Sequence, residues 1–293
     1  LTLRVTGNLY LGHAYHSCSN YPKAVEYLGR NVELLEGENA FERFGLSGLP
    51  YVVSCSWTVD SLAELGEFDR GLEYALRGTR VAETAGHPYS LAAIRTAEGY
   101  LRAHRGEHDA AITLLEPALE ICRSKNFAGW IMRAATALGI AYAHAGRSAE
   151  AIALHREAIR LQEAAGALTE RSSWWTNLAE AHLSGQKEEA RQAGEEALKF
   201  ATAHGERGWE AKARRVLGVA TAREELLLEA VSLAESLGMR PLLGRCHLSL
   251  GQLYRKLDAG ERARESFRKA ALLFRAMGMT YFLELALSEV RQI

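Results

Sequence analysis

The chain of 293 residues combines 48% hydrophobic with 24% charged residues and carries a formal net charge of −1. This composition is typical of a folded protein and excludes a disordered one. The near-zero charge gives no electrostatic reason for nucleic-acid binding, which usually needs a basic surface. No apolar run reaches the roughly 18 residues of a membrane span. We therefore predict no direct nucleic-acid partner and no membrane contact.

Four cysteines lie far apart in helical segments, at Cys18, Cys55, Cys122 and Cys246. Such spacing favours buried, reduced thiols, as in a protein of the cytoplasm. No signal peptide is visible at the first residues, which lack an apolar core. The predicted location is therefore cytoplasmic.

Helical periodicity recurs along the whole chain. Between residues 137 and 166, apolar residues at helical spacing form two segments separated by Gly146-Arg147-Ser148, the pattern of a helical hairpin. One hairpin cannot bury its apolar face alone, so repeated hairpins predict a solenoid. The position of Gly139 recurs at spacings of 47, 40, 40, 40, 39 and 33 residues, at Gly12, Val59, Gly99, Gly139, Ala179, Gly218 and Gly251.

These repeats predict an all-α, right-handed superhelix of seven hairpins followed by a capping helix. One irregularity interrupts the period between Glu36 and Pro50, where Phe41, Phe44, Leu46 and Leu49 favour a loop packed onto the solenoid. We expect a single domain over 1–293, cut from a larger protein, because the first hairpin lacks a polar capping helix. The hairpins are predicted at 1–36, 51–86, 90–126, 130–166, 171–205, 209–238 and 242–278, with the cap at 280–293.

The hairpin at the end of the chain carries a familiar pattern. Leu250-Gly251-x-x-Tyr254 is followed by Ala263, Phe267 and Ala270. This pattern resembles the tetratricopeptide repeat, although the period of 40 exceeds the usual 34 residues. Longer helices fit that difference, as in the helical superhelix of maltose-activator-type transcriptional regulators.

A second resemblance covers nearly the whole chain. The segment from Gly37 to Gly71, followed by Gly86-His87-Pro88-Tyr89-Ser90, is similar to the carboxy-terminal repeat region of large bacterial proteins. Those proteins join an adenylate or guanylate cyclase domain to an AAA-type signalling ATPase. The resemblance implies a regulatory region, because the cyclase and ATPase chemistry belongs to domains outside this sequence.

The sequence is nearly silent on catalysis. It contains no phosphate-binding Gly-Lys-Ser loop, no Gly-x-Ser-x-Gly elbow and no His-Glu-x-x-His zinc helix. His13 and His16 lie three residues apart, but no third metal ligand is suggested by spacing. His104 and His108 lie on either side of a turn rather than on one helical face. We predict a protein that is not an enzyme and needs neither cofactor nor metal.

Binding is the better prediction. In tetratricopeptide solenoids the first helix of each hairpin lines the inner groove, beside the recurring small position. A solvated helix face is the alternative for each of these residues. By that register the candidate groove residues are His13, His16, Ser56, Asp60, Thr96, Tyr100, Arg133, Thr136, Thr176, Glu180, Arg215, Arg245 and Arg255.

Aromatic residues recur near the start of several first helices. Two of the tryptophans lie nine residues before the reference glycines of their hairpins, and the others lie close to the equivalent position. They predict an aromatic row near one rim, suited to an apolar side chain of a peptide. Packing between hairpins explains the pattern equally well. The row comprises Tyr89, Trp130, Trp174, Trp175 and Trp209.

We therefore predict a non-catalytic protein- or ligand-binding region of a bacterial multidomain signalling ATPase, cyclase or transcriptional regulator. The expected partner is a protein, a peptide or another domain of the same parent chain, with a small-molecule effector as a further option. The alternative is a self-association scaffold that forms a homo-oligomer. A free-standing enzyme is the less favoured third interpretation, because no converging catalytic groups were found.

Overall fold

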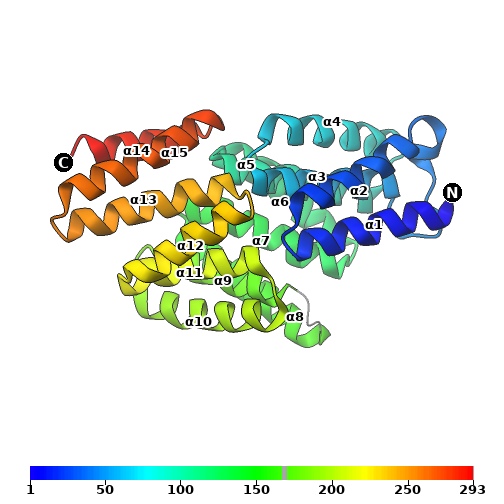
Figure 1. The fold of residues 1–293 in the computed structure, drawn as a ribbon. Coiled ribbons are helices and arrows are strands. Elements are labelled where there is room, and N and C mark those ends of the chain that lie inside the picture. The colour runs from blue at the N-terminus through cyan, green and yellow to red at the C-terminus, as the bar shows by residue number, and fades with distance from the viewer. Residues whose placement is uncertain (167–169, 293) are drawn as a thin grey trace.

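The computed structural model describes residues 1–166 and 170–292, and every regular element in these ranges is helical (Figure 1). The predicted all-α solenoid of seven hairpins and a final helix is confirmed. Residue 293, the last of the predicted cap, lies outside the described residues. The elements are α1 (Thr2–Ser17), α2 (Tyr21–Leu34), η1 (Gly37–Phe41), α3 (Pro50–Leu65), α4 (Phe68–Thr84), α5 (Pro88–Arg105), α6 (His108–Ser124), α7 (Ala128–His144), α8 (Ser148–Ala165), α9 (Arg171–His182), α10 (Lys187–His204), α11 (Arg207–Thr221), α12 (Glu224–Ser236), α13 (Arg240–Lys256), α14 (Gly260–Ala276) and α15 (Thr280–Val290).

Each hairpin closes where a small residue of its first helix meets the second helix. Gly139 of α7 faces the imidazole of His155 on α8, and a Cβ built on this glycine would lie 2.6 Å from Cε1 of the ring. The glycine therefore allows the close approach, because a larger residue would overpack the crossing. In the third hairpin Leu115 of α6 takes the place of the imidazole, against Gly99 of α5.

The segment between α2 and α3 packs onto the solenoid only in part. Leu49 is buried, and Phe44 and Leu46 are half-buried. The prediction that the apolar residues of this loop pack inward is wrong for Phe41, which is 44% exposed. The reason is the 3-10 helix η1, which turns Ala40 inward and leaves the next side chain facing solvent.

The superhelix curls until distant hairpins touch. The backbone N–H of Gly208, at the start of α11, donates to Oγ of Ser19 after α1 over 2.8 Å. Tyr21 at the start of α2 belongs to an apolar cluster with residues of α11, α12 and α13. Figure 1 shows the yellow α12 and the orange α13 next to the ends of α1 and α3. The inner faces of the first helices therefore surround an interior instead of lining a wide groove.

Three of the cysteines are buried thiols, but Cys18 is exposed. The prediction of buried thiols is wrong for Cys18, because α1 ends at the preceding residue and leaves it at a turn. In the part of the chain that the structure describes, none of the helices has the length and apolar character needed to cross a membrane.

Candidate functional site

Several adjoining cavities lie along the inner faces of the first helices. We call the largest the aromatic pocket, which has a volume of about 680 Å³ and lies among α1, α3, α5, α7 and α9. The central cavity, of about 60 Å³, shares Arg133, Glu170 and Trp174 with it. The basic pocket, of about 430 Å³, lies among the later hairpins and the final helix. A smaller cavity shares Asn177 with the central cavity and Glu180 with the basic pocket.

Aromatic side chains from successive first helices form the walls of the aromatic pocket. Tyr89 of α5 meets Phe127 edge-on, with ring centroids 5.1 Å apart, and meets Trp130 of α7 at 6.0 Å. His13 of α1 also lies against Trp57 of α3, at 4.2 Å between centroids. Edge-to-face packing of this kind fixes the rings and leaves apolar surface open to a ligand.

The predicted aromatic row divides between two cavities. Tyr89, Trp130 and Trp174 line the aromatic pocket, and Trp174 and Trp209 line the central cavity. Trp175 lines neither cavity and packs against an apolar cluster of α8, α9, α10 and α11 to which Trp174 also belongs. The register therefore brings most of these rings together, but the helix that carries Trp174 turns its neighbour away.

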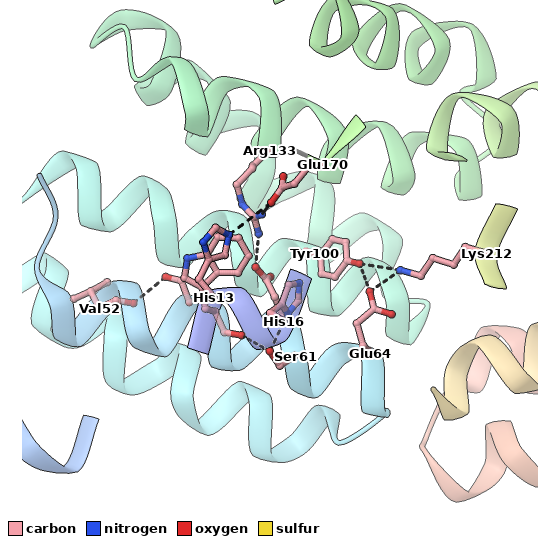
Figure 2. Close-up of polar contacts among 12 residues, drawn as sticks. His13, His16, Val52, Ser61, Glu64, Tyr100, Arg133, Glu170 and Lys212 are labelled. Carbon is pink, nitrogen blue, oxygen red and sulfur yellow. Dashed lines mark hydrogen bonds and ion pairs between the residues drawn. The ribbon is translucent and has the colours of Figure 1, made fainter. Parts of the chain in front are cut away.

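Arg133 connects the aromatic pocket to a group of buried carboxylates. Its guanidinium lies over the ring of Trp57, 4.0 Å from the centroid, and forms ion pairs with Asp60 of α3 and Glu170 before α9. Nε2 of His13 lies 4.0 Å from Oε1 of Glu170. Figure 2 shows His13, Arg133 and Glu170 converging from three separate segments. Side chains that are distant in the sequence thus form one charged wall.

The carboxylates of this wall titrate differently. Burial raises the pKa of Asp60 to about 6, and the neighbouring Arg133 only partly opposes that shift. Burial also acts to raise the pKa of Glu170, but Arg133 and His13 outweigh it and hold that pKa at about 2. The pKa of His16 falls to about 3 because of burial and of Arg133. Near neutral pH the site therefore holds one firmly ionised carboxylate and neutral His16.

Unpaired polar atoms face the central cavity. Oδ1 of Asp60, Oγ1 of Thr96 and Oγ1 of Thr136 are buried and find no hydrogen-bond partner among the described residues, and neither does Nδ2 of Asn177. Buried polar atoms without partners cost about 1 to 3 kcal/mol each. The cavity has room for a small polar group. A bound ligand or water with both donors and acceptors would therefore satisfy these atoms.

A second charged link holds the second hairpin to the sixth. Nζ of Lys212 on α11 lies 2.6 Å from Oε1 of Glu64 on α3, and the hydroxyl of Tyr100 donates to the same carboxylate (Figure 2). Burial acts to raise the pKa of Glu64, but Lys212 outweighs it and lowers that pKa to about 2. This ionised pair joins helices that are not neighbours along the solenoid.

The remaining predicted residues lie at the other end of the interior. Glu180 of α9 forms ion pairs with both Arg215 of α11 and Arg245 of α13. Arg255 is paired with Glu289 of the final helix. All except Glu289 line the basic pocket. The predicted set thus falls into two groups at opposite ends of the interior, linked by the cavities between them.

The alternative of a solvated helix face is wrong for several predicted residues. Asp60 is 2% exposed and Arg215 is 5% exposed, and Thr136 is buried as well. The closure of the superhelix removes these side chains from water. Two of the candidates serve their own helices instead of a site: the hydroxyl of Ser56 donates to the carbonyl of Val52, and that of Thr176 to the carbonyl of Ser172.

The histidine pairs engage other partners. Nδ1 of His16 lies 2.9 Å from Oγ of Ser61, and His13 contacts Trp57 and Glu170. Among the described residues no group of three or more histidines, cysteines or carboxylates is placed to hold a metal ion.

Sequence reasoning missed Trp57, Glu64, Glu170 and Lys212. Glu64 lies in α3, where nearly every residue is buried, so a carboxylate in that apolar segment was a usable signal. Lys212 lies six residues before Gly218, which is the register of Arg133 and Arg245 relative to their own glycines. Glu170 lies nine residues before Ala179, the register of Trp130 and Trp209 in their own hairpins, but it precedes α9 and carries a carboxylate where the register favours an aromatic ring.

The comparisons agree with this architecture. A family model described as tetratricopeptide repeat matches residues 90–164 and 130–203. The fold is also similar to a solved Rap protein complexed with competence and sporulation factor, with a TM-score of 0.76 and 16% identity over 94% of this chain and 76% of that one. Residues 90–203 of this chain thus match the tetratricopeptide repeat, and the whole described chain has the fold of a helical-repeat solenoid.

Two further structures have related solenoids. One is the Rap conjugation gene regulator of the plasmid pLS20 in complex with the Phr* peptide, with a TM-score of 0.73 and 15% identity over 93% of this chain and 75% of that one. The other is a signal transduction ATPase with a tetratricopeptide repeat sensor from Pyrococcus horikoshii, with a TM-score of 0.50 and 17% identity over 93% of this chain and 41% of that one. No curated protein matches the sequence. At these identities the likeness concerns the fold alone.

Proposed function

We propose that the solenoid is a non-catalytic regulatory scaffold that binds a peptide segment of a protein partner in the aromatic pocket. The observation that carries this proposal is the pocket itself, about 680 Å³ in volume and walled by aromatic rings from four successive first helices. This volume lies within the usual range of ligand pockets, and aromatic walls suit the apolar side chains of a peptide. The adjacent Arg133 and Glu170 offer a donor and an acceptor for the peptide main chain.

Related folds support this choice. The Rap regulator of plasmid pLS20 was solved in complex with the Phr* peptide, and the Pyrococcus horikoshii ATPase contains its solenoid as a sensor. Together with the resemblance to repeat regions of bacterial cyclase–ATPase proteins, these structures favour a sensor within a larger signalling protein. The bound segment then comes from a separate partner or from another domain of that parent.

Regulation follows from the closed shape. Lys212 and Glu64 join the sixth hairpin to the second, and Gly208 joins the sixth to the first through Ser19. A ligand that fits one curvature better than another shifts the balance between them by its difference in affinity. A shift of that kind changes the relative position of the two ends of the solenoid, which would act on any attached ATPase, cyclase or DNA-binding domain.

Two phenylalanines provide a matched test. Phe127 and Phe200 are both half-buried, but only Phe127 lines the aromatic pocket. Peptides selected from a random 12-residue phage library should bind the unmodified protein saturably. We expect Phe127→Ala to weaken that binding at least tenfold, as truncation of an aromatic hot-spot residue does. We expect Phe200→Ala to change it less than twofold.

The outcome separates the two interpretations of the aromatic row. If both variants bind the selected peptides as well as the unmodified protein does, the rings serve packing and the proposal fails. Thermal unfolding of each variant shows whether a loss of binding reflects a loss of fold. No peptide selected at all would also contradict the proposal.

Self-association is the second candidate, and one surface favours it. Helix α1 exposes Leu3, Tyr10 and Leu11, and Leu3 is 88% exposed. Exposed apolar patches of this kind often mark protein interfaces. Multi-angle light scattering should show a dimer that Leu3→Glu with Tyr10→Glu converts to a monomer. A concentration-independent monomer of the unmodified chain would remove this candidate.

A further inference from the structure

The basic pocket has a different chemistry from the aromatic pocket. It lies among α7, α9, α11, α13 and α15 and has a volume of about 430 Å³, within the usual range for small-molecule sites. Its lining includes five cationic side chains and a single carboxylate. The cations are Lys187, Arg215, Arg245, Arg255 and Lys256, and the carboxylate is Glu180.

The positive charges of this pocket exceed the negative charges that pair with them. Glu180 is shared by Arg215 and Arg245, so one carboxylate serves two guanidinium groups. Arg255 has its own partner in Glu289. Lys187 and Lys256 form no ion pair with a described residue. The pocket therefore carries an excess of about three positive charges, which counts the five cations against Glu180 and Glu289.

One of these cations is deeply buried and incompletely satisfied. Arg215 is 5% exposed, and its Nε has no hydrogen-bond partner among the described residues. Its Nη1 reaches only Oγ of Ser249, at 3.4 Å. Burial, together with the neighbouring Arg245, lowers the pKa of Arg215 to about 9. A buried guanidinium with an unmet donor is strongly destabilising unless an acceptor completes it.

Apolar side chains line the same pocket. They are Leu183, Leu248, Phe282 and Leu285, and Ser184 and Gln252 add neutral polar groups. The ring of Phe282 lies 5.8 Å from the guanidinium of Arg245. The pocket thus offers several hydrogen-bond donors together with carbon surface.

We propose that the basic pocket binds a compact polyanion with at least two negative charges, held by Arg215, Arg245 and the two unpaired lysines. Guanidinium groups recognise phosphate and carboxylate oxygens with paired hydrogen bonds, so both chemistries fit the donor set. The inference does not rest on the proposed peptide binding, because none of these side chains lines the aromatic pocket. The negative charges of the ligand pair with the cations for which the protein provides no carboxylate.

Pyrophosphate and citrate are suitable probes, because they are compact polyanions of the two chemistries. Isothermal titration of the full chain at constant ionic strength should give saturable binding of at least one of them, with a Kd below about 1 mM. Binding of pyrophosphate alone identifies a phosphate site, and binding of citrate alone identifies a carboxylate site. Each of these outcomes supports the proposal, and binding of neither anion overturns it.

A pair of matched double variants shows where the anion binds. Lys187→Gln with Lys256→Gln removes two exposed cations of the pocket, whereas Lys199→Gln with Lys269→Gln removes two exposed cations outside it. Both change the net charge equally and alter exposed side chains; the control also removes two exposed ion pairs, Lys199 with Glu196 and Lys269 with Glu265, which contribute at most about 1 kcal/mol each. We expect the pocket variant to weaken binding at least tenfold and the control to change it less than twofold. Equal weakening in both would mean general charge attraction and would overturn the proposal.

Discussion

At both ends of the interior the same position of the repeat carries an arginine, but the two arginines have different surroundings. Six residues before the reference glycine, the fourth hairpin carries Arg133 and the seventh carries Arg245. Arg133 lies over Trp57 in an aromatic pocket, whereas Arg245 shares a carboxylate with Arg215 in a basic one. The fold therefore decides where a side chain points, and its neighbours from other hairpins decide what it does there.

Cations at this register also close the superhelix. Arg133 pairs with Asp60 of the second hairpin, and Arg245 pairs with Glu180 of the fifth. Lys212, at the same register in the sixth hairpin, pairs with Glu64 of the second. Each pair spans hairpins that are not adjacent in the solenoid. Buried pairs of this kind are sensitive to removal of one partner, because the other charge is left unpaired.

The largest expected effect comes from breaking the charged wall of the aromatic pocket. Arg133→Met leaves buried Asp60 and the ionised Glu170 without their shared cation, and we expect a loss of about 3 to 5 kcal/mol in the free energy of unfolding. Urea denaturation measures this loss. Adding Glu170→Gln to the variant should restore part of it, since the unpaired charge is then gone. Arg123→Met, which breaks a more exposed pair with Glu157, should cost no more than about 1 kcal/mol.

The second prediction concerns His155, which lines the small cavity between the two pockets, and the pH dependence of the protein's stability. His155 is fully buried without a hydrogen-bond partner, and burial lowers its pKa to about 3. The unfolded chain takes up a proton at His155 near pH 6.5, whereas the folded protein does not. The contribution of neutral His155 to the free energy of unfolding is therefore present above pH 6.5 and is lost as the pH falls towards 3. At pH 5 the loss amounts to about 2 kcal/mol.

A leucine at this position should remove that dependence. Leu115 occupies the equivalent place in the third hairpin, so His155→Leu is compatible with Gly139 opposite. Unfolding midpoints at pH 7.5 and pH 5 should differ less in the variant than in the unmodified protein. An unchanged difference would mean that His155 is not the group that takes up the proton.

The smallest predicted effect compares two threonine hydroxyls, one that faces a cavity without a partner and one that is hydrogen-bonded within its own helix. The hydroxyl of Thr96 faces the central cavity without a partner, whereas that of Thr176 donates to the carbonyl of Ser172 over 2.6 Å. We expect Thr96→Val to leave stability unchanged or to raise it by up to about 1 kcal/mol, because an unsatisfied polar group is removed. Thr176→Val should lower it by about 1 kcal/mol. Thermal unfolding without ligand measures both, and equal losses would contradict the account.

The repeat architecture was predictable, because one period of small residues and turns runs through the chain. The register also selected residues that do reach the interior, including Asp60, Tyr100 and Arg133. What it did not reveal was which side chains meet across the superhelix. The pair between Lys212 and Glu64 joins residues 148 positions apart, and it depends on how tightly the solenoid curls. That curvature is a sum of small rotations in every hairpin, which no single motif specifies.

The insertion between α2 and α3 illustrates the same limit. Its glycines and proline indicated a loop, but they did not specify which apolar side chains would turn inward. The short helix η1 settles that by burying Ala40 instead of Phe41. Similarly, the repeat register led to the same prediction for the two adjacent tryptophans at the start of α9, but only Trp174 lines the cavities.

The central claim is that a peptide occupies the aromatic pocket, and the five tryptophans of the chain report on it directly. Fluorine NMR of the protein labelled with 5-fluorotryptophan, assigned by single Trp→Phe variants, should be recorded during titration with a selected peptide. We expect the resonances of Trp57, Trp130 and Trp174 to shift together, because these rings line the pocket. Trp175, which does not line the pocket but packs against the same apolar cluster as Trp174, should shift least. A saturable shift of Trp175 with the pocket tryptophans unmoved would contradict the account.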